Sequence, residues 1–245
     1  VLRAADPSGN VLRWDLGTSH AADAPVAELL KQGIGPSLAL MIPIFTGTLL
    51  LSLCAALLCA ATHGRLPDRL IVTASVGMMS VNYIVWIVAG QYLFAYRLGW
   101  FPVWGFESWR YLLLPVCIGI VSGLGHDVRF YRMAMIEEMR KDYVRTARAK
   151  GLSPARILFR HVLPNAMIPV LTRVVVALPF LYTGSLLLES FFGIPGLGYL
   201  SVNAVHSADA DVVQAVVLIG ALLFVGANLL TDILYAAADP RVRLR

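Results

Sequence analysis

Residues 36–62 read PSLALMIPIFTGTLLLSLCAALLCAAT and contain no charged side chain. A helix needs about 20 mostly apolar residues to cross a bilayer core of roughly 30 Å, so this run is long enough to span a membrane. Four more apolar runs follow at about residues 70–96, 111–125, 167–189 and 212–238. The third is short, and its helix is expected to continue to Met139. The sequence therefore predicts an all-α integral membrane protein with five transmembrane helices.

The composition of the whole chain agrees with this prediction. Of its 245 residues, 58% are hydrophobic and 14% are charged, whereas soluble domains average about 45–50% apolar and about 25% charged residues. A soluble domain and a disordered chain are both disfavoured, because so many apolar side chains must be buried. Cys54, Cys59 and Cys117 all lie in apolar runs. With no Cys-x-x-Cys or Cys/His cluster in the sequence, they are interpreted as buried hydrophobic residues and no metal site is expected.

Basic residues indicate the orientation in the membrane. The net charge is +5, and the segment from Asp127 to Pro164 accounts for all of it. Basic residues also occur in the 63–69 loop and in the C-terminal tail. Because loops rich in Lys and Arg stay in the cytoplasm, these segments and the C-terminus are predicted to be cytoplasmic, and residues 1–35 to be an external segment. Residues 1–35 hold no signal-like apolar stretch, so a further helix is expected upstream.

The long basic loop reads DYVRTARAKGLSPARILFRHVLP over residues 142–164. Good helix formers fill about residues 143–150, and Gly151 is typical of a chain that turns left-handed after a helix. A second helix is predicted to start with Ser153 as N-cap and Pro154 at its first position, and to stop before Pro164. The loop is thus expected to form a cytoplasmic helix-turn-helix.

This loop resembles the signature of the inner-membrane permeases of binding-protein-dependent ABC importers, which is Glu-Ala-Ala, three residues, Gly, nine residues and Ile-x-Leu-Pro. Arg145, Thr146 and Ala147 occupy its first places, Gly151 the glycine, and residues 161–164 its end, with the nine-residue gap intact. Arg145, Thr146 and His161 depart from the usual residues. The variant is similar to that of the oligopeptide, dipeptide and nickel branch, and stretches elsewhere resemble its B-type subunit.

The resemblance implies a permease subunit that translocates peptides or a related small solute across the cytoplasmic membrane, in a transmembrane domain formed by residues 36–245. It implies as partners a second permease subunit, two ATPase subunits and an external solute-binding protein. The segment at about 140–165 would be the loop that couples to the ATPase, through Arg145, Thr146, Ala147, Arg148, Gly151, Leu163 and Pro164. The family has six helices, so the helix expected upstream would be the first.

The energy source is expected outside this chain. A phosphate-binding loop needs Gly immediately before its Lys, whereas the residues before Lys31, Lys141 and Lys150 are Leu, Arg and Ala. No nucleotide site and no catalytic residue are therefore predicted here, and ATP is expected to bind the partner ATPase. No cofactor is expected in the chain itself.

Polar side chains inside apolar runs are costly and indicate function by default. Asn82, Gln91 and Glu189 are candidates for the translocation path or its gate. Arg173 lies inside the fourth run, where snorkelling to the membrane surface is the favoured interpretation. Asn228 and Asp232 share a helix face near the cytoplasmic end, where packing explains them at least as well as contact with the solute.

The sequence disfavours three functions other than that of a permease. A membrane-embedded enzyme such as an intramembrane protease is disfavoured, because no His-Glu-x-x-His motif occurs and the five histidines fall in loops or at helix ends. Binding of nucleic acid through the helix-turn-helix is disfavoured, because the loop is clamped between two spans. A passive channel would not need the signature spacing of the loop, and on spacing alone the loop could also be a simple positive-inside tether.

Overall fold

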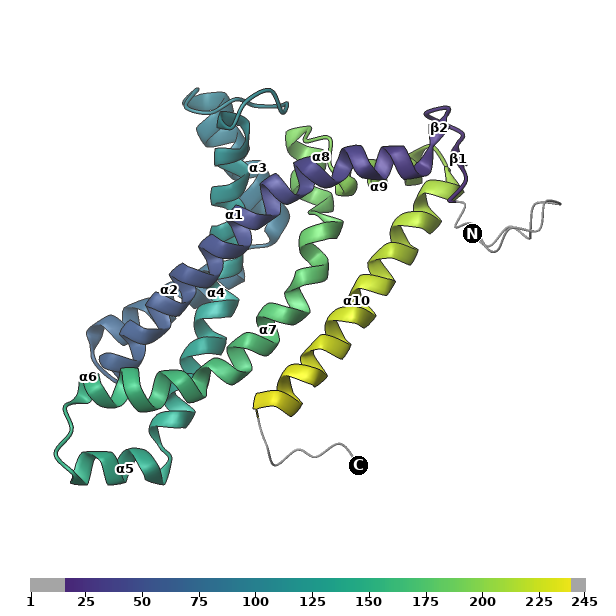
Figure 1. Ribbon diagram of the computed structural model, residues 1–245. Coiled ribbons are helices and arrows are strands. Elements are labelled where there is room, and N and C mark those ends of the chain that lie inside the picture. Colours follow the sequence, from purple (N-terminus) through teal and green to yellow (C-terminus); the bar gives the residue numbers. More distant parts are fainter. Residues whose placement is uncertain (1–15, 239–245) are drawn as a thin grey trace, which may run out of the picture.

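The structure is a computed structural model that describes residues 16–238 (Figure 1). A two-stranded antiparallel hairpin comes first, formed by β1 (Thr18–Ser19) and β2 (Ala24–Pro25). The remaining elements are helical, and η1 and η2 are π-helical segments: α1 (Val26–Ala61), α2 (Leu66–Ser80), α3 (Tyr83–Gly90), η1 (Gln91–Arg97), α4 (Arg110–Met139), α5 (Asp142–Ala149), α6 (Pro154–Ile157), η2 (Leu158–Val162), α7 (Leu163–Thr183), α8 (Leu186–Phe192), α9 (Leu197–His206) and α10 (Ala210–Ala238).

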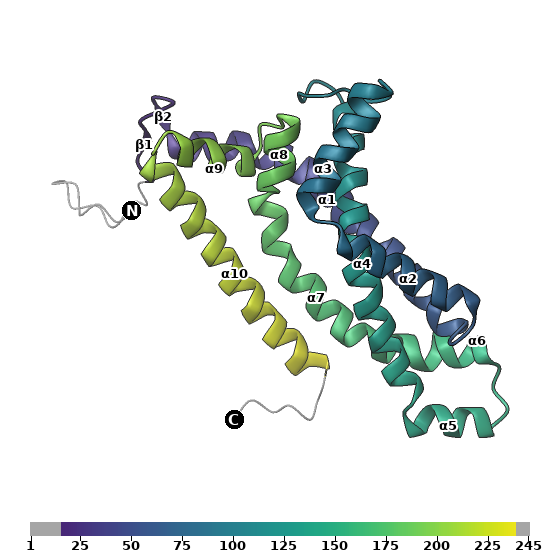
Figure 2. The same cartoon turned by 180° about the vertical axis from the view of Figure 1, so that it is seen from behind.

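The helices confirm the all-α membrane fold. Within residues 16–238, four helices are long and apolar enough to cross a membrane, and a fifth span results if the bent pair of α2 with α3 and η1 counts as one. The α5 helix and the start of α6 lie at one end of the bundle with the α1–α2 loop and the C-terminal end of α10 (Figure 1). The β hairpin, α8 and α9 lie at the opposite end, as the view from behind also shows (Figure 2).

The first long helix begins at Val26 rather than near Pro36. Its first ten residues include Glu28, Lys31 and Gln32, which lower the hydropathy of that stretch. The buried positions Val26, Leu30, Gly33, Ser37 and Leu40 nevertheless follow helical spacing, so one continuous face packs against the protein. The predicted boundary was therefore wrong by ten residues, because an amphipathic start has no uninterrupted apolar run.

The second predicted run, residues 70–96, is broken rather than straight. The axes of α2 and of α3 with η1 meet at 88°. Val81 is extended, and the side-chain oxygen of Asn82 accepts a hydrogen bond from the Ile84 backbone N–H over 2.9 Å. Asn is a preferred N-cap residue, so it starts a new helix where hydropathy alone indicates a single one.

The region around the fourth predicted span also differs from the expectation. The second helix of the coupling loop does not stop before Pro164. It continues as the π-helical η2 into α7, and Pro164 is the second residue of α7, directly after this π-helical segment. Proline and π-helical turns are usual sites of a local bend in a helix. The span then breaks at Gly184, which has φ +70°, and Ser185 caps α8 through the Leu188 backbone N–H.

Small residues allow α1 and α4 to pack closely. A Cβ atom on Gly119 would lie 2.6 Å from Ile44 Cδ1, and one on Gly47 would lie 2.5 Å from Ile120 Cδ1. Without a strong hydrophobic drive between helices in lipid, this close approach is what lets van der Waals contacts hold the pair together.

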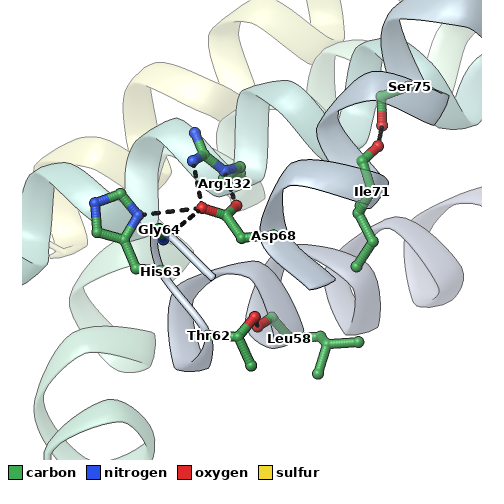
Figure 3. Close-up of polar contacts among 8 residues, drawn as sticks. All are labelled: Leu58, Thr62, His63, Gly64, Asp68, Ile71, Ser75 and Arg132. Atoms are coloured by element: carbon green, nitrogen blue, oxygen red, sulfur yellow. Dashed lines mark hydrogen bonds and ion pairs between the residues drawn. The ribbon is translucent and has the colours of Figure 1, made fainter. Parts of the chain in front are cut away.

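A buried ion pair joins three segments at the end of the bundle that carries α5 (Figure 3). Asp68 in α2 is only 2% exposed. Arg132 of α4 donates from Nε to Asp68 Oδ1 over 2.6 Å and from Nη2 to Oδ2 over 2.9 Å. The Gly64 backbone N–H also donates to Asp68 Oδ2 over 2.9 Å, and His63 Nδ1 lies 3.4 Å from it. The carboxylate thus fixes the α1–α2 loop against α4.

Replacing Arg132 should therefore destabilise the protein strongly. In Arg132→Met the Asp68 carboxylate stays buried without its charged partner, which costs about 3–5 kcal/mol. Equilibrium unfolding of the purified protein in detergent micelles measures this loss. The matched control is Lys141→Met, which removes the ion pair between Lys141 and Glu138. The Lys141 side chain is 51% exposed, so its loss should cost less than about 1 kcal/mol. Equal losses in the two variants would contradict the assignment of Asp68 as an anchor.

Candidate coupling hairpin and external gate

The α5 helix and the start of α6 form a tight helical hairpin at the positively charged end of the bundle. The Leu152 N–H donates to the Ala147 carbonyl over 3.3 Å and the Gly151 N–H donates to the Arg148 carbonyl over 2.9 Å. This pair of bonds is a Schellman motif, which needs a left-handed residue after the helix. Gly151 provides it with φ +77°. Ser153 Oγ then accepts from the Arg156 N–H and caps α6, which confirms the predicted helix-turn-helix.

One face of α5 is buried within the chain itself. Val144 is fully buried and Ala147 is 5% exposed. Both belong to a hydrophobic cluster that includes Ile157 and Val162 from the second arm of the hairpin and Met135 from α4. Ala147 is thus the small residue at which the two arms of this hairpin approach each other. Leu163 packs at the edge of the same cluster.

The other face of α5 is exposed and mostly basic. The exposed residues of this face and of the turn after it include Arg145, Thr146, Arg148 and Lys150. The Arg145 side chain is 79% exposed, and its only ion pair among the described residues is a 3.6 Å contact with the 95% exposed Asp142. Such an exposed pair contributes little to stability. The basic side chains of this face are therefore available for a partner.

Tyr143 ties the hairpin to the neighbouring membrane helices. Its hydroxyl donates to Glu138 Oε2 at the end of α4 over 2.5 Å. Asn165 of α7 donates from Nδ2 to the same hydroxyl over 3.4 Å and to the His161 carbonyl over 2.6 Å. Burial, and next the bond to Glu138, raise the pKa of Tyr143 to about 12. The phenol thus stays protonated as a donor, and its hydrogen bonds link α5 to α4 and α7.

Sequence reasoning missed Glu138, Tyr143 and Asn165 as supports of the hairpin. Their side chains meet only because α4 and α7 flank the hairpin, across up to 27 positions of sequence from Glu138 to Asn165. The one signal in the sequence is weak: Tyr143 follows Glu138, near the end of α4, by five residues.

At the opposite end of the bundle, Glu189 forms a completely buried hydrogen-bonded node. Its Oε1 accepts from Ser37 Oγ of α1 over 2.8 Å and from the Ser185 N–H over 3.2 Å, and its Oε2 accepts from the Tyr199 N–H of α9 over 3.0 Å. Ser37 Oγ in turn accepts from the Leu197 N–H over 2.8 Å. One carboxylate therefore joins α1, α8 and α9.

Glycine is needed around this carboxylate. A Cβ atom on Gly196 would lie 2.4 Å from Ser37 Oγ, and one on Gly198 would lie 2.9 Å from Glu189 Oε2. The Gly-rich stretch after α8 thus reflects the close approach of backbone to a buried charge, in addition to the left-handed helix end at Gly193.

Asn82 lies at the break between α2 and α3, and Gln91 lies where α3 continues as the π-helical η1. Gln91 Nε2 donates to the Val103 carbonyl over 2.8 Å and to the Phe191 carbonyl at the end of α8 over 3.0 Å. Asn82 caps α3, and the next residue, Tyr83, shares a 3.3 Å hydrogen bond with Ser185 at the start of α8. The three polar residues selected from the sequence thus fix the ends of the short helices around α8.

A cavity of about 750 Å³ lies beside these short helices. It is lined by residues of α3, α7, α8, α9 and α10, among which Tyr83, Phe180, Thr183, Ser185, Ser201 and His206 are the larger or polar ones. Its volume falls in the range of about 300–1,000 Å³ that is typical of small-molecule sites.

The β hairpin is clamped to the turn before α10 by a residue that the sequence did not single out. Asp209 is 2% exposed. Ser19 Oγ donates to its Oδ2 over 2.5 Å and the Ala21 N–H donates over 3.3 Å. The bond from Ser19 holds the pKa of Asp209 below its usual range. Asp209 thus fixes this end of α10 against the start of α1.

Gly151→Ala tests the left-handed turn of the hairpin. No atom lies within 4 Å of a Cβ placed on Gly151, so an alanine there would meet no clash. Its cost comes only from the left-handed backbone at φ +77° and is about 1–2 kcal/mol of local destabilisation. Faster hydrogen exchange of the α5 amides would report it. Gly77→Ala is the matched control, because its Cβ also meets open space but its backbone is helical. Unchanged exchange in Gly151→Ala would rule out the strain.

Comparisons with known proteins agree with this architecture. A family model described as "Binding-protein-dependent transport system inner membrane component" matches residues 52–244. The glutathione transport system permease protein GsiC of Escherichia coli O6:H1 is 35% identical over 236 residues, covering 96% of this chain and 77% of the relative. GsiC of Salmonella paratyphi A is 36% identical, also over 236 residues that cover 96% of this chain and 77% of the relative.

Among solved structures, the MetNI methionine ABC transporter in an inward-facing conformation has a chain of the same fold. Its TM-score is 0.69 at 19% identity, covering 86% of this chain and 97% of the other. The family match favours a transport subunit over a membrane-embedded enzyme. The chain belongs to the inner-membrane permease components of binding-protein-dependent ABC transport systems.

Proposed function

We propose that this permease translocates short peptides or related small solutes inward, driven by ATP hydrolysis in a partner subunit. The observation that carries the proposal is the basic, exposed face of α5 on a hairpin that is held rigidly by its neighbours. The similarity to glutathione permeases supports a peptide-type cargo, since glutathione is itself a tripeptide.

The proposed partners are a second permease subunit, two ATPase subunits that bind the ATP, and an external solute-binding protein. Arg145 and Arg148 are proposed to pair with an acidic rim on the ATPase, since complementary charge gives such contacts their specificity. Thr146 lies beside them. Ala147, Gly151, Leu163 and Pro164 serve the contact indirectly, by shaping the hairpin that presents the basic residues.

Asn82, Gln91 and Glu189 are proposed to act as the external gate rather than to contact the solute. Their hydrogen bonds fix α3, η1, α8 and α9 around the 750 Å³ cavity. Displacement of α7, which leads directly into α8 at Gly184, is proposed to open or close this cavity. Because packed elements switch between discrete arrangements, a small movement at the hairpin can be amplified there.

The proposed orientation has α5 in the cytoplasm, as the positive loops indicate. In a background without native cysteines, Ala22→Cys and Ser207→Cys should react with a membrane-impermeant maleimide added to intact cells, because both positions are exposed at the β-hairpin end. Lys150→Cys should react only after the cells are permeabilised. Labelling of position 150 in intact cells would overturn the orientation.

Charge reversal on α5 tests the proposed coupling. Arg145→Glu combined with Arg148→Glu should weaken association with the ATPase about tenfold or more, because like charges would face each other. Co-purification and ATP-dependent uptake measure the loss. The matched control combines Arg97→Glu with Arg110→Glu, the same charge change at exposed positions of the opposite end. If the α5 double variant binds its ATPase and transports like the parent, the loop is only a positive-inside tether.

A further inference from the structure

A charged pair lies at mid-height of the bundle, away from both ends described above. Arg173 is at the centre of α7 and Asp127 is in the middle part of α4. Arg173 Nε donates to Asp127 Oδ1 over 2.8 Å, and Arg173 Nη2 lies 2.7 Å from the same oxygen. The guanidinium also lies 5.1 Å from the centre of the Phe130 ring. Arg173 therefore has a structural partner within the protein, Asp127, which the sequence alone did not indicate.

One oxygen of this ion pair, Asp127 Oδ2, accepts no hydrogen bond from the residues that the structure describes. Both Arg173 contacts are to the same carboxylate oxygen, and no described residue donates a hydrogen bond to Asp127 Oδ2. The side chains of Asp127 and Arg173 are 19% and 44% exposed, so a further group can reach them. Charges inside a membrane helix are costly. Arg173 also interacts with the Tyr131 hydroxyl, whereas Asp127 Oδ2 keeps an acceptor site free.

The pair lines a cavity of about 380 Å³ between α1, α4 and α7. Its polar lining residues are Thr48, Asp127, Tyr131 and Arg173, and the rest of its wall is mostly apolar. Phe180 lines both this cavity and the 750 Å³ cavity beside α8 and α9. The two cavities therefore lie on either side of a shared wall residue, Phe180.

Thr48 is the independent sign that this cavity takes a polar ligand. It is 7% exposed, and among residues 16–238 its Oγ1 has no hydrogen-bond partner. Hydroxyls elsewhere in or just after α1 do have one: Thr46, Ser52 and Thr62 all donate to the carbonyl four residues earlier. A buried hydroxyl without a partner costs free energy, so Thr48 is expected to serve a group that enters the cavity.

We propose that this cavity binds the free amino and carboxyl ends of a short peptide during its passage. Asp127 Oδ2 accepts hydrogen bonds from the ammonium group, while Arg173 and the Thr48 hydroxyl donate to the carboxylate. The lining is neutral overall and offers both signs of charge, which fits a zwitterion better than an anion or a cation. A lipid headgroup is disfavoured by the central position of Arg173 in α7. This inference rests on the proposed transport of peptides.

The substitution Thr48→Val tests whether the cavity binds a ligand or whether its polar residues serve only the fold. The substitution keeps the shape and removes only an unpartnered hydroxyl, so the unfolding temperature without ligand should stay the same or rise. With trialanine as the probe, the complete transporter, permease pair and ATPases included, should show a raised unfolding temperature. Thr48→Val should weaken the apparent affinity about tenfold or more, as expected for a lost hydrogen bond to a charged group.

Two controls sharpen the test. Thr46→Val removes a hydroxyl of the same helix that is exposed and already bonded to the Ile42 carbonyl over 2.8 Å, and it should bind trialanine like the parent. N-acetyl-trialanine amide lacks both charged ends and should produce no shift in the parent. Equal affinity in Thr48→Val and the parent, or no shift by trialanine in the parent, would overturn the site.

Uptake into proteoliposomes distinguishes this inference from the function on which it rests. If the parent, supplied with its binding protein, takes up neither trialanine nor glutathione, the proposed function fails and the site fails with it. If the parent transports peptide and Thr48→Val transports it with the same KM, only the site is refuted. A raised KM in Thr48→Val, with Thr46→Val unchanged, supports both.

Discussion

Every backbone N–H and C=O group inside a membrane needs a partner within the protein, because the hydrocarbon core offers none. This constraint explains Asn82, Gln91 and Ser185 better than direct contact with a solute does. At the α2–α3 and α7–α8 breaks, a side chain replaces a missing backbone bond. Asn82 caps α3 and Ser185 caps α8. The Gln91 side chain, at the start of η1, donates hydrogen bonds to the carbonyl groups of Val103 and Phe191. The breaks are therefore built features, and they gather at the end that holds α8 and α9.

The two ends of the bundle are stabilised by buried carboxylates with different partners. Asp68 faces the guanidinium of Arg132, so its charge is balanced and the α1–α2 loop is fixed to α4. Glu189 faces backbone N–H groups and the hydroxyl of Ser37, none of which carries a full charge. A group held only by dipoles is easier to displace than a bidentate ion pair. The difference fits an anchor at the α5 end and a movable gate at the other.

The hairpin of α5 and α6 combines a buried inner face with an exposed outer face. Val144 and Ala147 are buried in the same cluster as residues of α4 and α7, and Tyr143 adds hydrogen bonds to both. The basic side chains point away from these contacts and cost the fold little if they are changed. Residues that shape the hairpin are thus separate from residues that can recognise a partner, although they alternate within eight positions of α5.

The sequence by itself determined the membrane class, the apolar runs, the helix-turn-helix and its glycine, because hydropathy, capping residues and left-handed turns are local properties. It did not determine where helices begin or break. Val26 starts α1 within a polar stretch, and Asn82 and Gly184 interrupt runs that read as continuous. Nor could it reveal that Asp127 and Arg173 form a pair or that Ala147 faces its own chain. These depend on which residues the packing of α1, α4 and α7 brings together, across separations that no local pattern encodes.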